Sequence, residues 1–432
     1  MRSRSSARAA RTALAAATAL ALSVTWAVAV WAGADGATRP AQPGTAGTGR
    51  VTAARARATQ AREVDARTGW RLSFVSQPGA AVGSSSRAAR SAGWRIAAVR
   101  HYGAAHDASG YSAVVTTGKS TAWVFGGTNP GGASTPVALE WNGSHWRSWP
   151  LPHGLTGFIS SASAPSANDI WAVSYTGGYL LHWNGRKWTV ARRWHQRGPL
   201  TGVTALGPRD VWVFGTTAAG LRGIGTWHFN GRTWTRVTGL AAEIYQASAV
   251  SRHDIWAVAA TRKGGLIEHY NGRTWRQVRT GGALGQARLD DVLALTRDNV
   301  WVVGNMPGHR GDGRLVVAHF TGRRWIRMMT PWHADTGRLA AAGTGGVWVT
   351  ADNTGNRSDA LIGRLCRGCH PRWVTVRWGL GTGITDIAVN RRTGTVWISG
   401  GFLTKAGGDA AVWSHRDRRV DNDDWIRTGG PL

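Results

Sequence analysis

The segment Cys366-Arg367-Gly368-Cys369-His370 has residue types and spacing that could do chemistry. Taken alone, a Cys-x-x-Cys-His sequence is the signature of covalent haem attachment, with the histidine as axial iron ligand. Cys366 and Cys369 are also the only cysteines of the chain, and in an exported protein such a pair is typical of a disulfide. We favour a disulfide that pins an enlarged hairpin, with haem at Cys366, Cys369 and His370, or a metal or redox role, as alternatives. A zinc site is not predicted, because no neighbouring His or Cys supplies the two further ligands it needs.

A second group combines tryptophan, histidine and arginine in segments that join one predicted repeat to the next. Exposed tryptophan suits stacking on sugar rings, and arginine suits acidic groups. The alternative is that these are ordinary loop residues, with the tryptophans tucked over the edge of a sheet. The candidate binding residues are Trp194, His195, Trp332, His333, His153, Arg192, Arg193 and Arg338.

Few residues of this sequence match a known catalytic pattern. Most glycosidases need two carboxylates at a set separation, and sialidases use a tyrosine nucleophile. Only Glu243 and Tyr245, two residues apart, offer such a pair near the start of a predicted strand. The sequence contains no G-x-S-x-G, H-E-x-x-H or phosphate-binding loop. These observations favour a protein that is not an enzyme, with a glycan-processing site at Glu243 and Tyr245 as the alternative.

The elements that must position these residues repeat along the chain. An aliphatic residue followed by tryptophan, preceded by aspartate in the most regular copies, recurs every 41 to 49 residues. A period near 45 with strand-like alternation is the signature of a β-propeller blade. Seven copies predict an all-β protein with seven four-stranded antiparallel blades. The repeated tryptophans are Trp123, Trp171, Trp212, Trp256, Trp301, Trp348 and Trp397.

Each blade can be laid out from its sequence. Strand one is small and apolar, as in GVTALG from Gly202, and should line the central channel; strand two carries the repeated tryptophan. Strand three ends in an aromatic residue before Asn-Gly, which predicts a hairpin with a type I′ turn, whose two central residues have positive φ. Large rings at these positions should pack between neighbouring blades. Strand four opens with tryptophan, at Trp146, Trp188, Trp234, Trp275, Trp325, Trp373 and Trp425.

Three short segments compete to close the ring. GWRLSFV from Gly69 and GWRIAAV from Gly93 both match strand four of a blade, and DDWIR from Asp424 is a C-terminal candidate. One of the two N-terminal copies is expected to add a strand to the last blade. Closure of this kind removes the open sheet edge that would otherwise promote aggregation.

The pattern D-[IV]-W-[AV]-V followed by [WFY]-N-G-x-x-W resembles the repeats of secreted bacterial propellers of the kelch and Asp-box kind, over roughly residues 94–430. Gly231–Trp234 and Gly272–Trp275 keep the Gly-x-Thr-Trp half of an Asp-box but lack its Ser and Asp. The kelch double glycine appears only at Gly126-Gly127 and Gly400-Gly401. The resemblance therefore implies a seven-bladed architecture and little about activity, because such propellers include both enzymes and binding modules.

The N-terminal residues predict export. Residues 1–12 carry four arginines and no acid, and residues 13–34 are uncharged, as in a signal peptide. Cleavage is expected after Ala34 or Ala29, although 22 apolar residues could also remain as an uncleaved anchor. The predicted organisation is a signal peptide or anchor at 1–34, a low-complexity linker at 35–92 and the propeller at 93–432. The protein is expected outside the cytoplasm, secreted or anchored, with membrane contact only through residues 13–34.

The chain has a formal net charge of +29, a balance that favours polyanionic partners. Nearly all of this charge is arginine, since Lys119, Lys187, Lys263 and Lys405 are the only lysines. The basic residues form no long cluster in the sequence, which argues against a specific nucleic-acid site. The alternative is that the positive charge is spread over the surface and has no binding role. The sequence as a whole predicts an exported, non-catalytic propeller that binds a polysaccharide, another polyanion or a protein partner at or beyond the cell surface.

Overall fold

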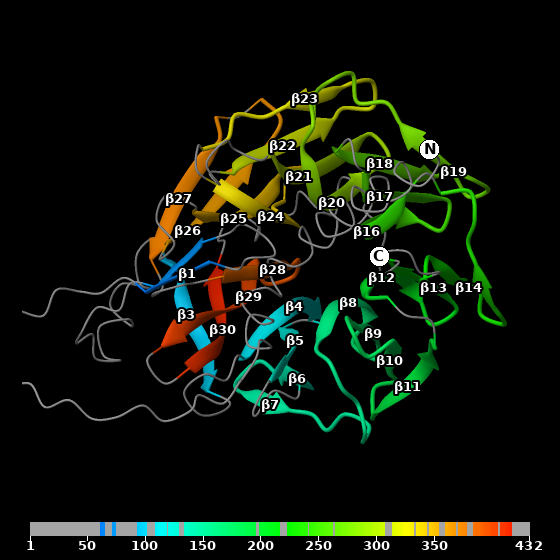
Figure 1. Cartoon of the computed structure of the whole chain (residues 1–432), viewed down its shortest axis with the longest axis vertical. Helices are drawn as coiled ribbons and strands as arrows, with labels where there is room; N and C mark the ends of the chain where they lie inside the picture. Colours follow the sequence, from blue (N-terminus) through cyan, green and yellow to red (C-terminus); the bar gives the residue numbers. More distant parts are fainter. Residues whose placement is uncertain are drawn as a thin grey trace, which may run out of the picture.

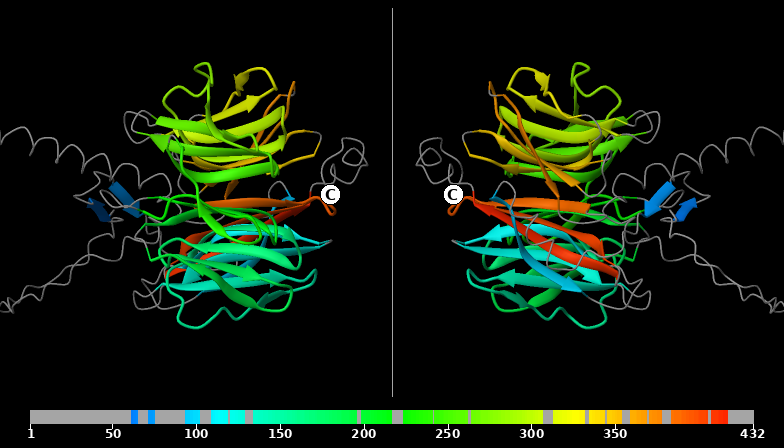
Figure 2. Two further views of the ribbon diagram at one scale, coloured as in Figure 1. Left: turned by 90° about the vertical axis from the view of Figure 1, so that its right-hand side faces the viewer. Right: turned by 90° about the vertical axis from the view of Figure 1, so that its left-hand side faces the viewer.

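The computed structural model describes Ala61–Val64 (β1), Arg71–Phe74 (β2) and most of residues 93–416. Within that last range the description leaves out residues 102–108, 119, 129–133, 196–197, 217–222, 241, 262–263, 307–312, 332–333, 344, 354–358, 369, 378–382 and 405–406. The strands from β3 to β30 form seven four-stranded antiparallel sheets in a ring (Figure 1). Seen from the side, the ring is a disc (Figure 2). The predicted seven-bladed β-propeller is confirmed.

Blades are numbered here in chain order, and strands run from the innermost to the outermost of each sheet. Blade 1 comprises β4 (Ser109–Thr117), β5 (Thr121–Thr128), β6 (Thr135–Trp141) and β7 (Trp146–Ser148). Blade 2 comprises β8 (Ile159–Ser166), β9 (Asp169–Ser174), β10 (Tyr179–Trp183) and β11 (Trp188–Arg193). Blade 3 comprises β12 (Leu200–Gly207), β13 (Asp210–Gly215), β14 (Trp227–Phe229) and β15 (Trp234–Arg236). Blades 4 and 5 comprise β16 (Glu243–Ser251), β17 (Asp254–Thr261), β18 (Gly264–Tyr270) and β19 (Trp275–Val278); and β20 (Arg288–Thr296), β21 (Asn299–Met306), β22 (Arg314–Phe320) and β23 (Trp325–Arg327). Blades 6 and 7 comprise β24 (Ala334–Ala341), β25 (Val347–Asn353), β26 (Asp359–Leu365) and β27 (Arg372–Arg377); and β28 (Gly383–Asn390), β29 (Thr395–Thr404), β30 (Gly407–Arg416) and β3 (Arg95–His101).

The ring is closed by the second of the two N-terminal copies. Strand β3 pairs antiparallel with β30, from Arg95 opposite Ser414 to His101 opposite Asp409. The first copy forms β2 instead, which pairs with β1 outside the seven blades. The C-terminal candidate, including Trp425, lies outside the described residues. The last blade therefore joins strands from both ends of the propeller, and β28 packs against β4 to complete the circle.

The Asn-Gly hairpins differ from the type I′ turn expected of them. In each, a four-residue loop joins strands three and four, as between Trp141 and Trp146. Only the glycine has positive φ, at 101° for Gly143; among the described residues Thr336 alone has positive φ without being glycine. The asparagine side chain replaces the second left-handed residue, because Asn142 Oδ1 accepts hydrogen bonds from two backbone amides of the loop, each at 3.0 Å. The prediction of a hairpin was right, and its turn type was wrong.

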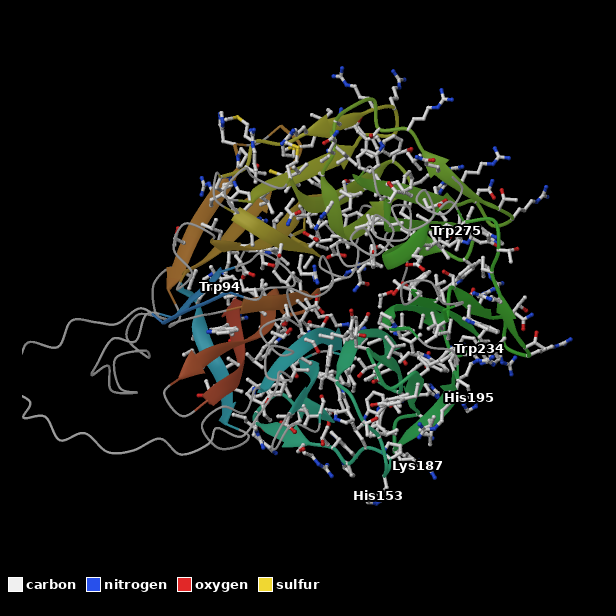
Figure 3. All side chains as sticks on the ribbon, viewed as in Figure 1. Trp94, His153, Lys187, His195, Trp234 and Trp275 are labelled. Atoms are coloured by element: carbon white, nitrogen blue, oxygen red, sulfur yellow. The ribbon has the colours of Figure 1, made fainter. Side chains whose placement is uncertain are left out.

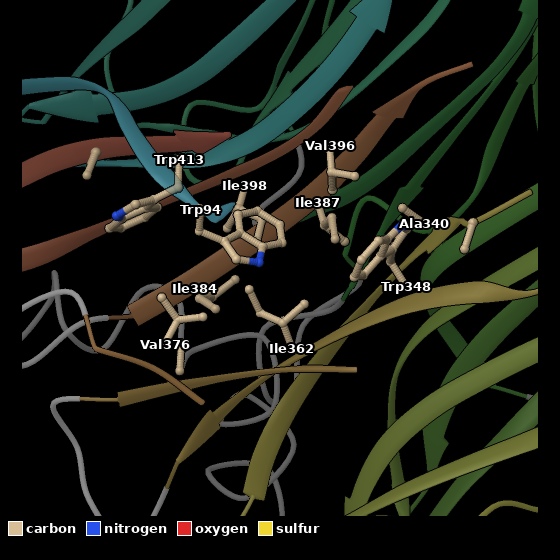
Figure 4. Close-up of a cluster of buried hydrophobic side chains, with 13 residues drawn as sticks. Trp94, Ala340, Trp348, Ile362, Val376, Ile384, Ile387, Val396, Ile398 and Trp413 are labelled. Carbon is tan, nitrogen blue, oxygen red and sulfur yellow. The ribbon is translucent and has the colours of Figure 1, made fainter. Parts of the chain in front are cut away.

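The repeated tryptophans pack between blades, as predicted. Trp123 of blade 1 lies edge-on to Trp188 of blade 2, and Trp212 of blade 3 lies edge-on to Trp275 of blade 4. The same contact closes the ring, where Trp397 of blade 7 meets blade 1. Figure 4 shows the cluster between blades 6 and 7, which includes rings from Trp348 and Trp94. Each twisted sheet thus buries one face against the blade before it and one against the blade after it.

Every innermost strand has a β-bulge near its start. A bulge can re-aim a side chain, and the extra residue bonds to the backbone of the next blade at Ser112, Ser160, Thr201, Asp290 and Thr385. Ser160 Oγ donates to the carbonyl of Leu200 at 2.8 Å, and Thr201 Oγ1 donates to that of Ile244 at 3.0 Å. The blades are therefore joined by hydrogen bonds around the channel in addition to the apolar contacts between them.

Replacement of Trp212 by alanine tests the packing between blades. Its side chain is 2% exposed, and a buried large-to-small change of this kind costs about 3–5 kcal/mol. We expect urea denaturation of Trp212→Ala to show that loss. Ile326→Ala is the control, because Ile326 is 37% exposed and its loss should cost less than about 1 kcal/mol. Equal stability of the two variants would contradict the interblade role of the tryptophans.

Candidate functional site

The acidic and imidazole side chains of the repeat are held inside the blades. In blade 2, Asp169 Oδ1 accepts hydrogen bonds from Trp171 Nε1 and from His182 Nε2, each at 2.8 Å. The rings of Trp171 and His182 stack with their centroids 4.0 Å apart. One carboxylate oxygen therefore fixes both rings, which come from two adjacent strands.

The histidine contact recurs in the next three blades, and the tryptophan contact recurs in blades 4 and 5. In blade 4, Asp254 accepts from Trp256 at 2.9 Å and from His269 at 2.8 Å. In blade 3, the contact between Asp210 and His228 is kept at 2.8 Å. In blade 5 an asparagine takes the place of the aspartate. The equivalent contacts there involve Asn299, Trp301 and His319, at 2.8 and 2.9 Å.

The histidine of this arrangement was not identified in the sequence, although a signal for it is present. Each such histidine directly precedes the aromatic residue that ends strand three, as in His182-Trp183 and His269-Tyr270. Strand pairing then places it opposite the tryptophan of strand two, as with His182 and Trp171. Residues with the chemistry of general acids and bases are thus used to hold the repeat together.

The substitution of asparagine for aspartate in blade 5 changes the electrostatics of its histidine. Burial lowers the pKa of His319 to about 4, and the positive charge of Arg367 acts in the same direction. The side chain of His319 is buried, and its neighbour Asn299 carries no charge to stabilise an imidazolium. His319 is therefore a neutral hydrogen-bond donor at neutral pH.

The predicted binding residues of blade 2 take part in packing. Trp194 is buried and lies in the apolar cluster between blades 2 and 3. The Arg192 guanidinium lies among three indole rings, 5.2 Å from the centroid of Trp194, 4.6 Å from that of Trp227 and 5.4 Å from that of Trp234. Burial lowers the pKa of Arg192. The Trp194 ring is consequently not available for stacking on a sugar.

The other predicted binding residues do not gather at one place. His153 and His195 are exposed at the outer edge of the disc (Figure 3). Arg193 is exposed, with its guanidinium 5.7 Å from the ring of Tyr179. Arg338 lies within the innermost strand β24, on the channel side of the blade, rather than in a loop. Trp332 and His333 lie outside the described residues.

The catalytic alternative pairs two side chains at the start of β16. Glu243 is half-buried, and Tyr245 is buried at the bulge of that strand. Tyr245 is the extra residue of that bulge, between Ile244 opposite Ala259 and Gln246 opposite Val258. Among the described residues, no group of three or more His, Cys, Asp or Glu side chains is arranged to hold a metal ion.

The Cys-x-x-Cys-His segment lies in the hairpin between β26 and β27, where other blades have Asn-Gly. His370 and Arg367 are exposed there. No cysteine of the described residues is a free thiol. Cys369 lies outside those residues, so its bridge to Cys366 stays a prediction.

Two aspartates of innermost strands have carboxyl groups with raised pKa values. Burial raises the pKa of Asp291 to about 6 and that of Asp386 to about 7, and in both cases Arg338 acts against the shift. Each carboxylate accepts the amide of the next blade, from Leu339 to Asp291 and from Val114 to Asp386, at 2.9 Å. These acids therefore join blade 5 to blade 6 and blade 7 to blade 1.

No protein-family model and no curated protein matches this sequence. Solved structures share its fold, however. A structure titled YCF48 bound to D1 peptide is 14% identical, with a TM-score of 0.52, and the match covers 75% of this chain and 97% of that one. YCF48 from Cyanidioschyzon merolae is 12% identical at a TM-score of 0.50, covering 75% and 99%. The WD40 repeats of RRP9 are 10% identical at a TM-score of 0.54, covering 76% and 99%.

At these identities the likeness establishes the fold alone. The chain is a seven-bladed β-propeller, and its blades 2 to 4 carry an aspartate–histidine pair beside the repeated tryptophan. No helix in the described part of the chain has the length and apolar character needed to cross a membrane.

The aspartate of the repeat can be tested by comparing two substitutions in blade 4. Asp254→Ala leaves the nitrogens of Trp256 and His269 without their acceptor, which should cost about 1–3 kcal/mol. Asp254→Asn should cost less than about 1 kcal/mol, because Asn299 fills the same place in blade 5. Urea unfolding measures both. A larger loss for asparagine than for alanine would contradict the role of the side-chain oxygen.

The low pKa of His319 predicts a dependence of stability on pH. Between about pH 6.5 and 4 an unfolded histidine binds a proton that folded His319 does not, so this contribution to stability is lost as the pH falls through that window. Asp291 and Asp386 act in the opposite sense, since their raised pKa values favour the folded state at low pH. Nuclear magnetic resonance titration should place the His319 midpoint near 4, and higher in Asn299→Asp. A midpoint near 6.5 in the wild type would contradict this prediction.

Proposed function

We propose that this protein is an exported, non-catalytic β-propeller that binds a partner at or beyond the cell surface. The observation that carries the proposal is the use of the repeat histidines and aspartates as internal supports. Asp169, Asp210 and Asp254 each hold a histidine at 2.8 Å. Residues fixed in this way support the blades and leave the turns and loops to do the binding.

A protein partner and a polymeric partner are both consistent with a propeller. The solved YCF48 structure contains a bound D1 peptide, so one protein of this architecture takes a polypeptide. The basic composition of the present chain, with a net charge of +29, favours an acidic ligand of either kind. Binding modules of this type place a rigid scaffold under variable loops.

Export also supports the assignment of the two cysteines. In an oxidising compartment, Cys366 and Cys369 would form a disulfide that ties the enlarged hairpin of blade 6. An intact mass two hydrogens below the reduced chain, without an added haem, is the expected result. A haem absorbance band would instead indicate a haem attached covalently to Cys366 and Cys369, with His370 as axial ligand.

The non-catalytic assignment is tested with the exported protein and a panel of acidic and neutral glycans. We expect saturable binding to one class of ligand, with no shortening of the glycan and no release of sugar. Glu243→Gln is the informative variant, because Glu243 and Tyr245 are the remaining catalytic candidates. Hydrolysis that disappears in Glu243→Gln would establish a glycan-processing enzyme instead, and hydrolysis that persists would place the catalytic site elsewhere in the chain.

A further inference from the structure

The turns between strands one and two and those between strands three and four lie at the same end of each blade. This follows from the antiparallel order of the four strands, since strands one and three run in the same direction. The two turns touch: a Cβ atom on Gly231 would lie 2.8 Å from Cβ of Arg209, and one on Gly322 would lie 2.9 Å from Cβ of Asp298. Because all blades face the same way around the ring, these turns cover one face of the disc. We call it the turn face.

Exposed basic side chains recur on the turn face. In the hairpins of blades 2 to 5, the residue after Asn-Gly or Thr-Gly is an exposed arginine, Arg186, Arg232, Arg273 or Arg323. The turns between strands one and two add Arg209, Arg252 and Arg297 in blades 3 to 5. Further exposed basic residues of this face are Lys187, Arg324, Arg367, Arg391 and Arg392.

Acidic side chains are few in the described turns of this face. Within its described turns, Asp298 is the only acidic residue. The aspartates that begin strand two in blades 2 to 4 are held by histidines. Asp210 also lies 3.7 Å from Nε of Arg252. The repeat thus places an arc of positive charge on this face, while other exposed arginines, such as Arg147 and Arg276, lie on the outer strands.

The turn face also lacks the apolar centre of a typical protein interface. The exposed large hydrophobic residues of the described chain are Val99, Ile326, Met329 and Val374, and all lie outside these turns. Protein interfaces are depleted of charge at their core and enriched in apolar and aromatic groups. Arginine, by contrast, forms paired hydrogen bonds with carboxylate, sulfate and phosphate groups. A polymer with many anionic groups therefore matches this face better than a folded protein does.

We propose that the turn face binds a linear acidic polysaccharide, through the arc of Arg186, Arg232, Arg273 and Arg323. This inference rests on the proposed binding function and names its surface and ligand class. One arginine per blade at an equivalent position would meet successive anionic groups of a chain that follows the ring. Each contact is weak because it is exposed, and the arc gains affinity from their number.

Substitution by serine removes the charge without disturbing the hairpin, because blade 1 carries Ser144 at the same position. The backbone amides of Ser144 and Arg232 make the same hydrogen bond, 3.0 Å from the preceding asparagine Oδ1. The test pair is Arg232→Ser with Arg273→Ser. The matched control is Arg100→Ser with Arg279→Ser. Both arginines are exposed and lie at or next to the ends of outermost strands that point away from the turn face. Both pairs lower the net charge equally.

Binding of the full-length protein to heparin, polygalacturonate, dextran, double-stranded DNA and polyglutamate would be measured at several salt concentrations. With about a twofold loss per exposed contact, we expect about fourfold weaker heparin binding for the test pair. Adding Arg186→Ser and Arg323→Ser should bring the loss to about sixteenfold. The control pair should stay within about 1.5-fold of the wild type. The salt dependence of binding should become shallower only in the test variants.

Equal losses in the test and control pairs would overturn the proposal and assign the arginines to diffuse charge. Tighter binding of polyglutamate or DNA than of the acidic glycans would overturn it in favour of a protein or nucleic-acid partner. Shortening of the polysaccharide during the assay would count against the non-catalytic function and not against the turn face. Circular dichroism and thermal melting of every variant confirm that a loss of binding does not come from unfolding.

Discussion

The structure depends on the contact between each blade and the next. A four-stranded sheet of this size cannot bury both of its faces alone, so each blade is stable only against its neighbours. The tryptophan of strand two provides this contact, as Trp123 does against blade 2 and Trp397 does against blade 1. The closing pair of β3 and β30 then leaves the ring without an open edge between its first and last blades.

The polar residues of the repeat serve the same contact. Asp169 orients an indole and an imidazole together, and the orientation of the indole decides how it meets the next blade. Around the channel, the bulge side chains and the carboxylates of Asp291 and Asp386 add hydrogen bonds between innermost strands. The acidic and imidazole groups of the repeat therefore stabilise the ring.

The turns at the ends of the strands vary between blades. The hairpin residue after the glycine donates its backbone amide to the asparagine of the turn, as Ser144, Arg232 and Arg273 do. Its side chain is therefore free to vary, and blade 1 has serine where blades 2 to 5 have arginine. Because the same turn position recurs from blade to blade, an arginine at that position in several blades produces an arc of positive charge on one face.

The number of blades, the order of strands and the residues that begin and end the strands could be predicted from the sequence. Those features depend on local periodicity and turn chemistry, which are visible without tertiary structure. The choice of β3 over two similar segments depends on pairing with β30, about 300 residues away, and local patterns do not report such pairing. The same holds for Trp194, which reads as a loop residue but is buried by blade 3. The hydrogen bond between His182 and Asp169 and the position of four hairpin arginines on one face became visible in the tertiary structure. The physical reason is that contacts across strands and blades decide which side chains meet.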